Sequence, residues 1–171
     1  PKKRTRIPRR FVYASGILGL LCGVLLFPFS MDGRIWKASF DLAHAPSFFL
    51  AVVGLAVLLD PSLVRANSSF SIVLPMSPPR LMMLSGGIAI LGAACEVAQT
   101  YVGRSATLAD ALANSAGAIS ACLMLRGFRS CGFRKRVVYL CAAITMLLLP
   151  AAEPLLEIRE TLIARSEFPL L

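Results

Sequence analysis

Charged residues are scarce in this sequence. Only 16% of the 171 residues are Asp, Glu, Lys or Arg, 57% are hydrophobic, and the mean hydropathy is +0.73. Soluble domains usually carry about 25% charged residues. The apolar residues also run in blocks of about 20, the helical length that crosses a hydrocarbon core ~30 Å thick. The composition therefore excludes an ordinary soluble domain and predicts an all-α, integral membrane helical bundle.

Motifs for metal binding and nucleophilic catalysis are missing. The chain has one histidine, so it contains no His-Glu-x-x-His pair. Its five cysteines are scattered, and no two of them have metal-ligand spacing. We therefore expect no metal, no cofactor and no disulfide, and we favour a non-catalytic protein over an enzyme.

Acidic residues are outnumbered two to one, which gives a net charge of +9. The basic residues, however, flank apolar blocks and do not form a polar domain with interleaved aromatic residues, so binding to nucleic acid is not expected. Basic residues beside apolar spans set membrane topology and contact anionic lipid head groups. Two groups stand out: Lys2, Lys3, Arg4, Arg6, Arg9 and Arg10 before the first block, and Arg126, Arg129, Arg134, Lys135 and Arg136 before the last.

Five apolar segments qualify as membrane spans. They cover about residues 12–29, 42–59, 81–102, 107–125 and 137–150. A basic arm, residues 1–11, precedes this 12–150 domain, and residues 151–171 form a tail. The first span lacks a small-x-small cleavage site and is interpreted as an uncleaved helix. Pro150 and Pro154 are expected to end the last span.

The distribution of Lys and Arg predicts the orientation. With five spans, 13 of the 18 basic residues fall on the side of the N-terminus. The positive-inside rule then places the N-terminus in the cytoplasm and the C-terminus outside.

With this topology, the few polar residues inside the spans fall at one depth, near the outer face. They are Asp41, His44, Glu96, Gln99, Arg104, Asp110 and Asn114. Spacings of three or four residues put each pair on one helix face. An intramembrane charge costs about 2.5–3.5 kcal/mol or more, so unpaired carboxylates are hard to retain. We therefore predict that the seven residues share a binding pocket.

Simpler interpretations exist for the individual residues. Asp110 could interact with a helix dipole, and Asp41 could be an N-cap. A Glu96–Arg104 ion pair could clamp a helical hairpin, and the amides of Gln99 and Asn114 could join helices by hydrogen bonds.

The same residues resemble the VanZ-like family, which is named for a membrane protein linked to resistance to the glycopeptide teicoplanin. The pattern Glu-x2-Gln-x4-Arg-x5-Asp-x3-Asn-x2-Gly runs from Glu96 to Gly117, and Asp-x-x-His-x-x-x-Phe runs from Asp41 to Phe48. The resemblance covers about residues 41–125. It implies a multi-pass protein of the bacterial inner (cytoplasmic) membrane and the cell envelope. Leu42 departs from the Lys that is usual in the family, and the segment "RSEFPLL" resembles the lead-in to an extracytoplasmic carbohydrate-binding domain.

The favoured function is binding of a membrane lipid or a lipid-linked envelope precursor. Arg104 and His44 would hold an anionic phosphate of the head group, while Gln99 and Asn114 would bond sugar or glycerol hydroxyls.

Two alternatives stay open. The protein could be an accessory subunit that contacts other membrane-protein subunits through faces rich in glycine (Gly16, Gly19, Gly23, Gly86 and Gly87). It could also be a membrane enzyme acting on a lipid-linked substrate, with Glu96, Asp110 and His44 as acid and base.

Overall fold

The computed structural model describes residues 9–26, 33–59, 76–102, 107–130 and 132–167. Every element in these ranges is helical, which confirms the all-α prediction. The elements are α1 (Arg9–Leu26), α2 (Arg34–Leu59), α3 (Pro78–Gln99), η2 (Thr100–Val102), α4 (Leu108–Arg129), α5 (Phe133–Leu148), η3 (Leu149–Ala151) and α6 (Ala152–Glu167).

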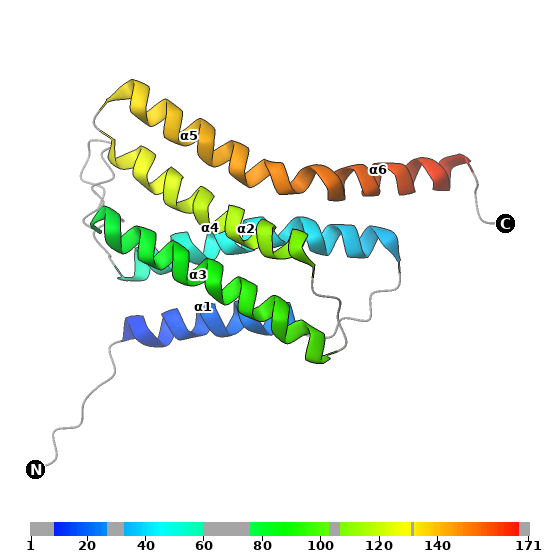
Figure 1. Ribbon diagram of the computed structural model, residues 1–171, viewed down its shortest axis with the longest axis horizontal. Helices are drawn as coiled ribbons and strands as arrows, with labels where there is room; N and C mark the ends of the chain where they lie inside the picture. Colours follow the sequence, from blue (N-terminus) through cyan, green and yellow to red (C-terminus); the bar gives the residue numbers. More distant parts are fainter. Residues whose placement is uncertain (1–8, 27–32, 60–75, 103–106, 131, 168–171) are drawn as a thin grey trace, which may run out of the picture.

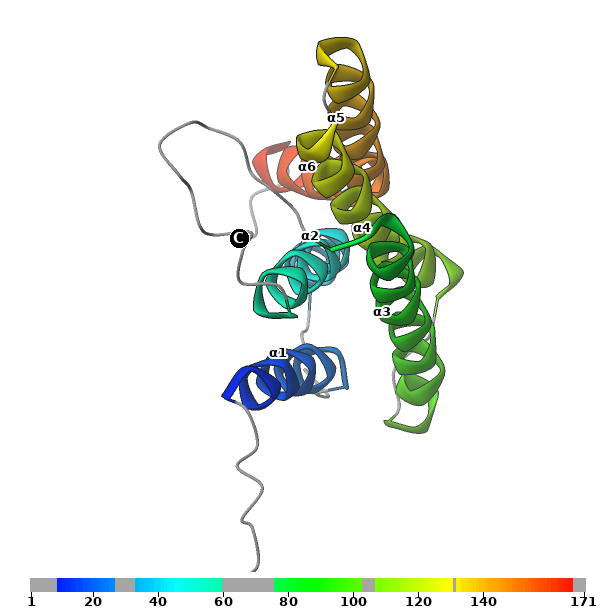
Figure 2. The ribbon, with the colours of Figure 1, turned by 90° about the vertical axis from the view of Figure 1, so that its left-hand side faces the viewer.

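Helices α2 and α4 form the centre of the bundle (Figures 1 and 2). Helix α3 packs on α4, α1 lies beside α2 and α3, α5 follows α4, and α6 lies beside α2. Consecutive helices from α1 to α5 run in opposite directions. The start of α1, the end of α2, the start of α3, the end of α4 and the start of α5 therefore gather at one end of the bundle.

Four helical segments are long and apolar enough to cross a membrane: Arg34–Leu59, Pro78–Gln99, Leu108–Arg129 and Phe133–Ser166. They correspond to the second to fifth predicted spans. The apolar part of α1, Val12–Gly23, is shorter than a membrane crossing. The predicted first span extends to residue 29, beyond the last described residue of α1.

The helix that contains the last predicted span does not end at Pro150 or Pro154, which corrects the expectation that these prolines terminate it. Pro150 lies in the short helix η3 and Pro154 in the first turn of α6. In a first helical turn the backbone N–H has no intrahelical acceptor, so proline costs little there. The Leu149 N–H donates to the Thr145 carbonyl and the Ala152 N–H donates to the Leu149 carbonyl. The chain therefore tightens for one turn and continues as helix to Glu167.

Helix α2 begins at Arg34, well before the predicted start near residue 42. Asp41 consequently lies about two turns inside the helix, and its interpretation as an N-cap is wrong. The helix continues through Pro46 to Leu59. This start places Asp41 and His44 on a continuous helical face next to α4 and α6.

The contact between α2 and its neighbours depends on small residues. The side chain of Phe48 is fully buried and packs over Gly92 of α3. Gly117 of α4 lies directly against the backbone carbonyl of Ala45. The close approach of α2 and α4 brings the polar residues of the two helices within hydrogen-bond distance.

Candidate functional site

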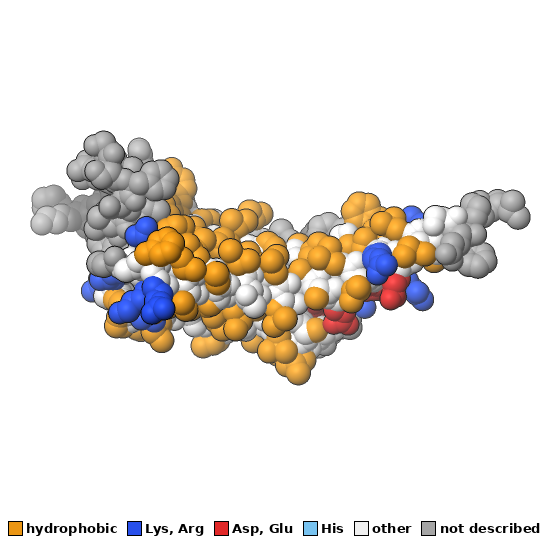
Figure 3. Space-filling model, turned by 90° about the horizontal axis from the view of Figure 1, so that it is seen from above, with side chains coloured by type: hydrophobic (Ala, Val, Ile, Leu, Met, Phe, Trp, Pro, Cys, Tyr) orange, Lys and Arg blue, Asp and Glu red, His pale blue; other side chains and the backbone are white. Residues whose placement is uncertain are grey.

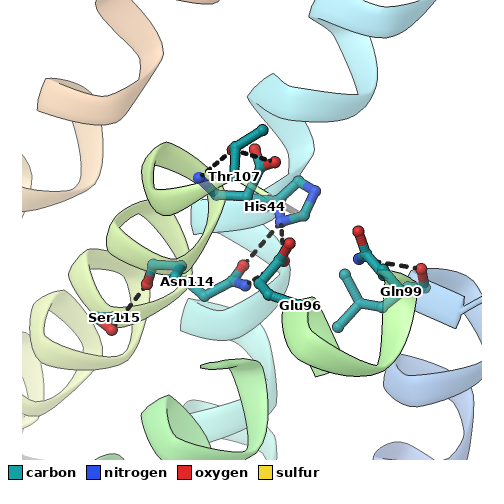
Figure 4. A network of polar contacts seen from close by, with 9 residues as sticks. His44, Glu96, Gln99, Thr107, Asn114 and Ser115 are labelled. Atoms are coloured by element: carbon teal, nitrogen blue, oxygen red, sulfur yellow. Dashed lines mark hydrogen bonds and ion pairs between the residues drawn. The ribbon is translucent and has the colours of Figure 1, made fainter. Parts of the chain in front are cut away.

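Three of the predicted polar residues form a buried network that joins α2, α3 and α4 (Figure 4). His44, Glu96 and Asn114 are 3%, 3% and 0% exposed. The Asn114 amide nitrogen Nδ2 donates to Glu96 Oε1 at 3.0 Å. His44 Nδ1 lies 2.9 Å from Asn114 Oδ1 and 3.7 Å from Glu96 Oε1. Each of the three helices α2, α3 and α4 thus contributes one side chain, and each of these side chains is held by the other two.

The pattern of donors in this network fixes the protonation of one nitrogen of the imidazole. Because the Asn114 NH2 group faces the Glu96 carboxylate, its carbonyl oxygen faces His44. The opposite amide orientation would place two acceptors together. The His44 nitrogen Nδ1 therefore carries a hydrogen and donates it to Asn114. Among the described residues no hydrogen bond is formed at Nε2, so a neutral His44 presents a lone pair there.

Two carboxylates lie at the edge of the network. Asp41 and Asp110 are partly buried, and one oxygen of each lies within 4.8 Å of the other and of a ring nitrogen of His44. The Thr107 hydroxyl donates to Asp110 Oδ2 and accepts from the Asp110 N–H. The edge of the cluster is therefore rich in hydrogen-bond acceptors.

Asp41, His44 and Asp110 are the described residues that could hold a metal ion. A tetrahedral zinc ion with ligands at about 2.0–2.1 Å keeps its donor atoms about 3.3 Å apart. The ligand atoms of the three side chains all lie within 4.8 Å of one another, an upper bound that includes this spacing.

Gln99 does not join this network. Its side chain is 1% exposed, and its Nε2 donates to the backbone carbonyl of Leu25 in the last turn of α1 at 3.2 Å. Figure 4 shows the hydrogen bond of Gln99 running toward α1, separate from the contacts among His44, Glu96 and Asn114. Gln99 therefore joins α3 to α1. This agrees with the simpler interpretation, in which its amide joins helices by a hydrogen bond.

The structure thus brings together five of the seven predicted residues: Asp41, His44, Glu96, Asp110 and Asn114. Gln99 bonds elsewhere, and Arg104 lies outside the described residues. Its predicted contacts, including the ion pair with Glu96, stay predictions.

Sequence reasoning missed Thr107. This residue is the N-cap of α4, and Asp110 is the third residue of the helix. A Ser or Thr followed three residues later by an acidic residue is a known capping signal, so the spacing from Thr107 to Asp110 could have identified the pair. The cap fixes the orientation of Asp110 at the edge of the cluster. It also fits the simpler interpretation of Asp110 as an acid near a helix start.

No family model, no curated protein and no solved structure matches the chain. The resemblance to the VanZ-like family therefore rests on the residues that carry the pattern.

Proposed function

We propose that the chain is a multi-pass protein of the bacterial cytoplasmic membrane, with its N-terminus in the cytoplasm and its C-terminus outside. The four long apolar helices support a multi-pass membrane protein, and the distribution of Lys and Arg supports the orientation. Large apolar side chains also point outward, among them Leu50, Met83 and Ile90, each at least 65% exposed. Figure 3 shows one such apolar face, with basic side chains gathered at one end and both acidic and basic side chains toward the other. Positive charge without acidic side chains at the first end fits a cytoplasmic side.

The proposed function is non-catalytic binding of a polar head group near the outer leaflet, in a protein of the VanZ-like type. The head group would belong to a membrane lipid or a lipid-linked envelope precursor. The observation that carries this proposal is the arrangement of the cluster. Behind its edge, His44, Glu96 and Asn114 bond one another, whereas Asp41 and Asp110 are only partly buried and lie side by side.

The geometry changes the expected roles of the binding residues. Gln99 and Asn114 were expected to bond hydroxyl groups, but both are buried and use their amides within the protein. We assign the hydroxyl or ammonium groups of the head group to the acceptors Asp41 and Asp110, with His44 Nε2 as a further acceptor. Arg104 keeps its proposed contact with phosphate, on the evidence of the sequence pattern.

This assignment predicts that the double substitution Asp41→Asn, Asp110→Asn reduces lipid retention. Each lost charge-assisted hydrogen bond is worth about 1.5–3 kcal/mol, so we expect at least a tenfold loss of the most tightly retained lipid. The measurement is native mass spectrometry of protein purified in mild detergent from bacterial membranes.

The matched control is Glu153→Gln, Glu160→Gln, which removes two exposed carboxylates from α6. It should retain lipid as the unmodified protein does. Equal retention by both double variants would contradict the proposal. Turnover of a lipid-linked substrate by the purified protein, lost in Glu96→Gln, would favour the enzymatic alternative.

One observation favours the alternative of an accessory subunit. A Cβ atom added at Gly16, Gly19, Gly23, Gly86 or Gly87 would meet no heavy atom within 4 Å. The glycine faces of α1 and α3 are therefore open within the described part of the bundle. Close packing of a partner helix on such faces is common in membranes. Co-purification of a partner that is lost in Gly86→Leu would support this alternative over the head-group proposal.

A further inference from the structure

A groove lies at the end of the bundle where the α4–α5 connection and the start of α3 meet. Its cavity volume is ≈ 610 Å³, within the range of about 300–1,000 Å³ that is typical of ligand pockets. The floor is apolar and comes from α4, α5, the start of α3 and the residues just before it. It includes Met76, Leu81, Leu125 and Tyr139.

The rim of this groove is strongly basic. Four cations line it, and no carboxylate does so among the residues that the structure describes. The cations are Arg126, Arg129, Arg134 and Lys135. We call this feature the basic groove.

Two of the four cations are positioned by contacts with neighbouring residues. Arg129 Nη1 donates to the backbone carbonyl of Met76 at 2.8 Å. A guanidinium has five N–H donors, and this bond uses one. The Arg126 guanidinium lies over the Tyr139 ring, 5.7 Å from its centroid. These contacts hold the two guanidinium groups at the groove and leave N–H donors of Arg129 for a ligand.

The basic groove and the polar cluster lie at opposite ends of α4. Asp110 and Arg129 are 19 residues apart on this helix, which at ~1.5 Å per residue is roughly 28 Å along the axis. A hydrocarbon core is ~30 Å thick. When one site lies at the head groups of one leaflet, the other therefore lies at the head groups of the opposite leaflet.

We propose that the basic groove binds an anionic phospholipid, most tightly one whose head group carries two phosphates. The four cations, with no carboxylate among the described lining residues, allow two cations to pair with each of two phosphate groups, and basic pockets between membrane helices bind such head groups. The apolar floor supplies a surface for acyl chains, which a soluble phosphate compound would not use. Two residues next to lining residues in the sequence are also apolar and exposed, Met82 beside Leu81 and Val138 beside Tyr139.

The test is native mass spectrometry of the full chain in detergent, titrated separately with cardiolipin, phosphatidylglycerol and phosphatidylcholine. We expect affinity to fall in that order, with cardiolipin at least tenfold above phosphatidylcholine. The substitution Arg134→Gln, Lys135→Gln should reduce cardiolipin affinity about tenfold or more, because each basic residue near a membrane surface contributes substantially to anionic-lipid binding. Both side chains are exposed, so the fold should persist, and a thermal melt checks this.

The matched control is Arg159→Gln, Arg165→Gln, which removes two exposed cations from α6, away from the groove. It should leave cardiolipin affinity unchanged, and Arg134→Lys should retain it. Equal binding of the three lipids, or equal losses in the two double variants, would overturn the proposal. Competition by soluble glycerophosphate at similar concentrations would identify a phosphate site that does not need a lipid. The result is independent of head-group binding at Asp41 and Asp110, which neither double variant touches.

Discussion

Replacing Asn114 with leucine should lower the free energy of unfolding by about 2–4 kcal/mol. The substitution introduces an apolar side chain with the same branching as asparagine. It removes the hydrogen-bond donor to Glu96 and the acceptor for His44. A hydrogen bond between membrane helices contributes only ~0.6 kcal/mol on average. A buried polar group left without its partner, however, costs about 1–3 kcal/mol, and this second effect dominates here.

The measurement is reversible unfolding in detergent, compared with the neighbouring variant Ser115→Ala. Among the described residues the Ser115 hydroxyl bonds only the Ala111 carbonyl of its own helix, so its loss should cost less than 1 kcal/mol. A triple variant, His44→Phe, Glu96→Leu, Asn114→Leu, should recover part of the loss, because it removes the polar groups together. If Asn114→Leu is no more destabilising than Ser115→Ala, the network does not stabilise the bundle.

Replacing Gly117 with alanine should lower the free energy of unfolding by about 3 kcal/mol, at least as much as Asn114→Leu does. An added methyl group would overlap the backbone carbonyl oxygen of Ala45. A flexible side chain could turn aside, but a backbone carbonyl within α2 cannot move without shifting the helix. We expect α2 and α4 to separate, which would also lengthen the hydrogen bond between His44 and Asn114.

The control for this prediction is Gly86→Ala on α3. An added Cβ at Gly86 meets nothing within 4 Å, and alanine is a better helix former than glycine by about 0.8–1.0 kcal/mol. Gly86→Ala should therefore raise the melting temperature slightly while Gly117→Ala lowers it. The same response from both variants would show that the contact of Gly117 with Ala45 does not limit the approach of α2 and α4.

These two predictions concern one structural unit. Ala45 follows His44 on α2, and Gly117 lies three residues after Asn114 on α4. The missing side chain at Gly117 permits the helix contact, and the contact sets the distance from His44 to Asn114. Asn114 and Gly117 are thus linked physically as well as by their spacing in the sequence pattern.

Much of the fold could be predicted from the order of the residues. Hydropathy located four long helices because blocks of about 20 apolar residues have few alternatives to helix in such a chain. The alternating directions of the helices then brought Asp41, Glu96 and Asp110 toward the same end of the bundle. A cluster could be predicted from this argument without knowledge of any contact.

Partner choice could not be predicted in the same way. Gln99 and Asn114 carry amides with similar bonding capacity, yet one bonds the Leu25 carbonyl and the other bonds His44 and Glu96. Spacing along one helix gives the face on which a side chain lies, but not which neighbouring helix covers that face. Likewise, proline near a helix end can stop the chain or begin the next turn, and Pro150 and Pro154 do the latter.

By itself, then, the sequence determined the helical class, the approximate extent of the apolar segments and the end of the bundle at which the acidic and amide residues gather. Only the tertiary structure decided which of them bond, that Asp41 and Asp110 remain at the edge beside His44, and that three separate segments combine into the basic groove. The physical reason is that hydropathy and helical period act along one chain segment, whereas hydrogen bonds and cavities depend on the distances and rotations between helices.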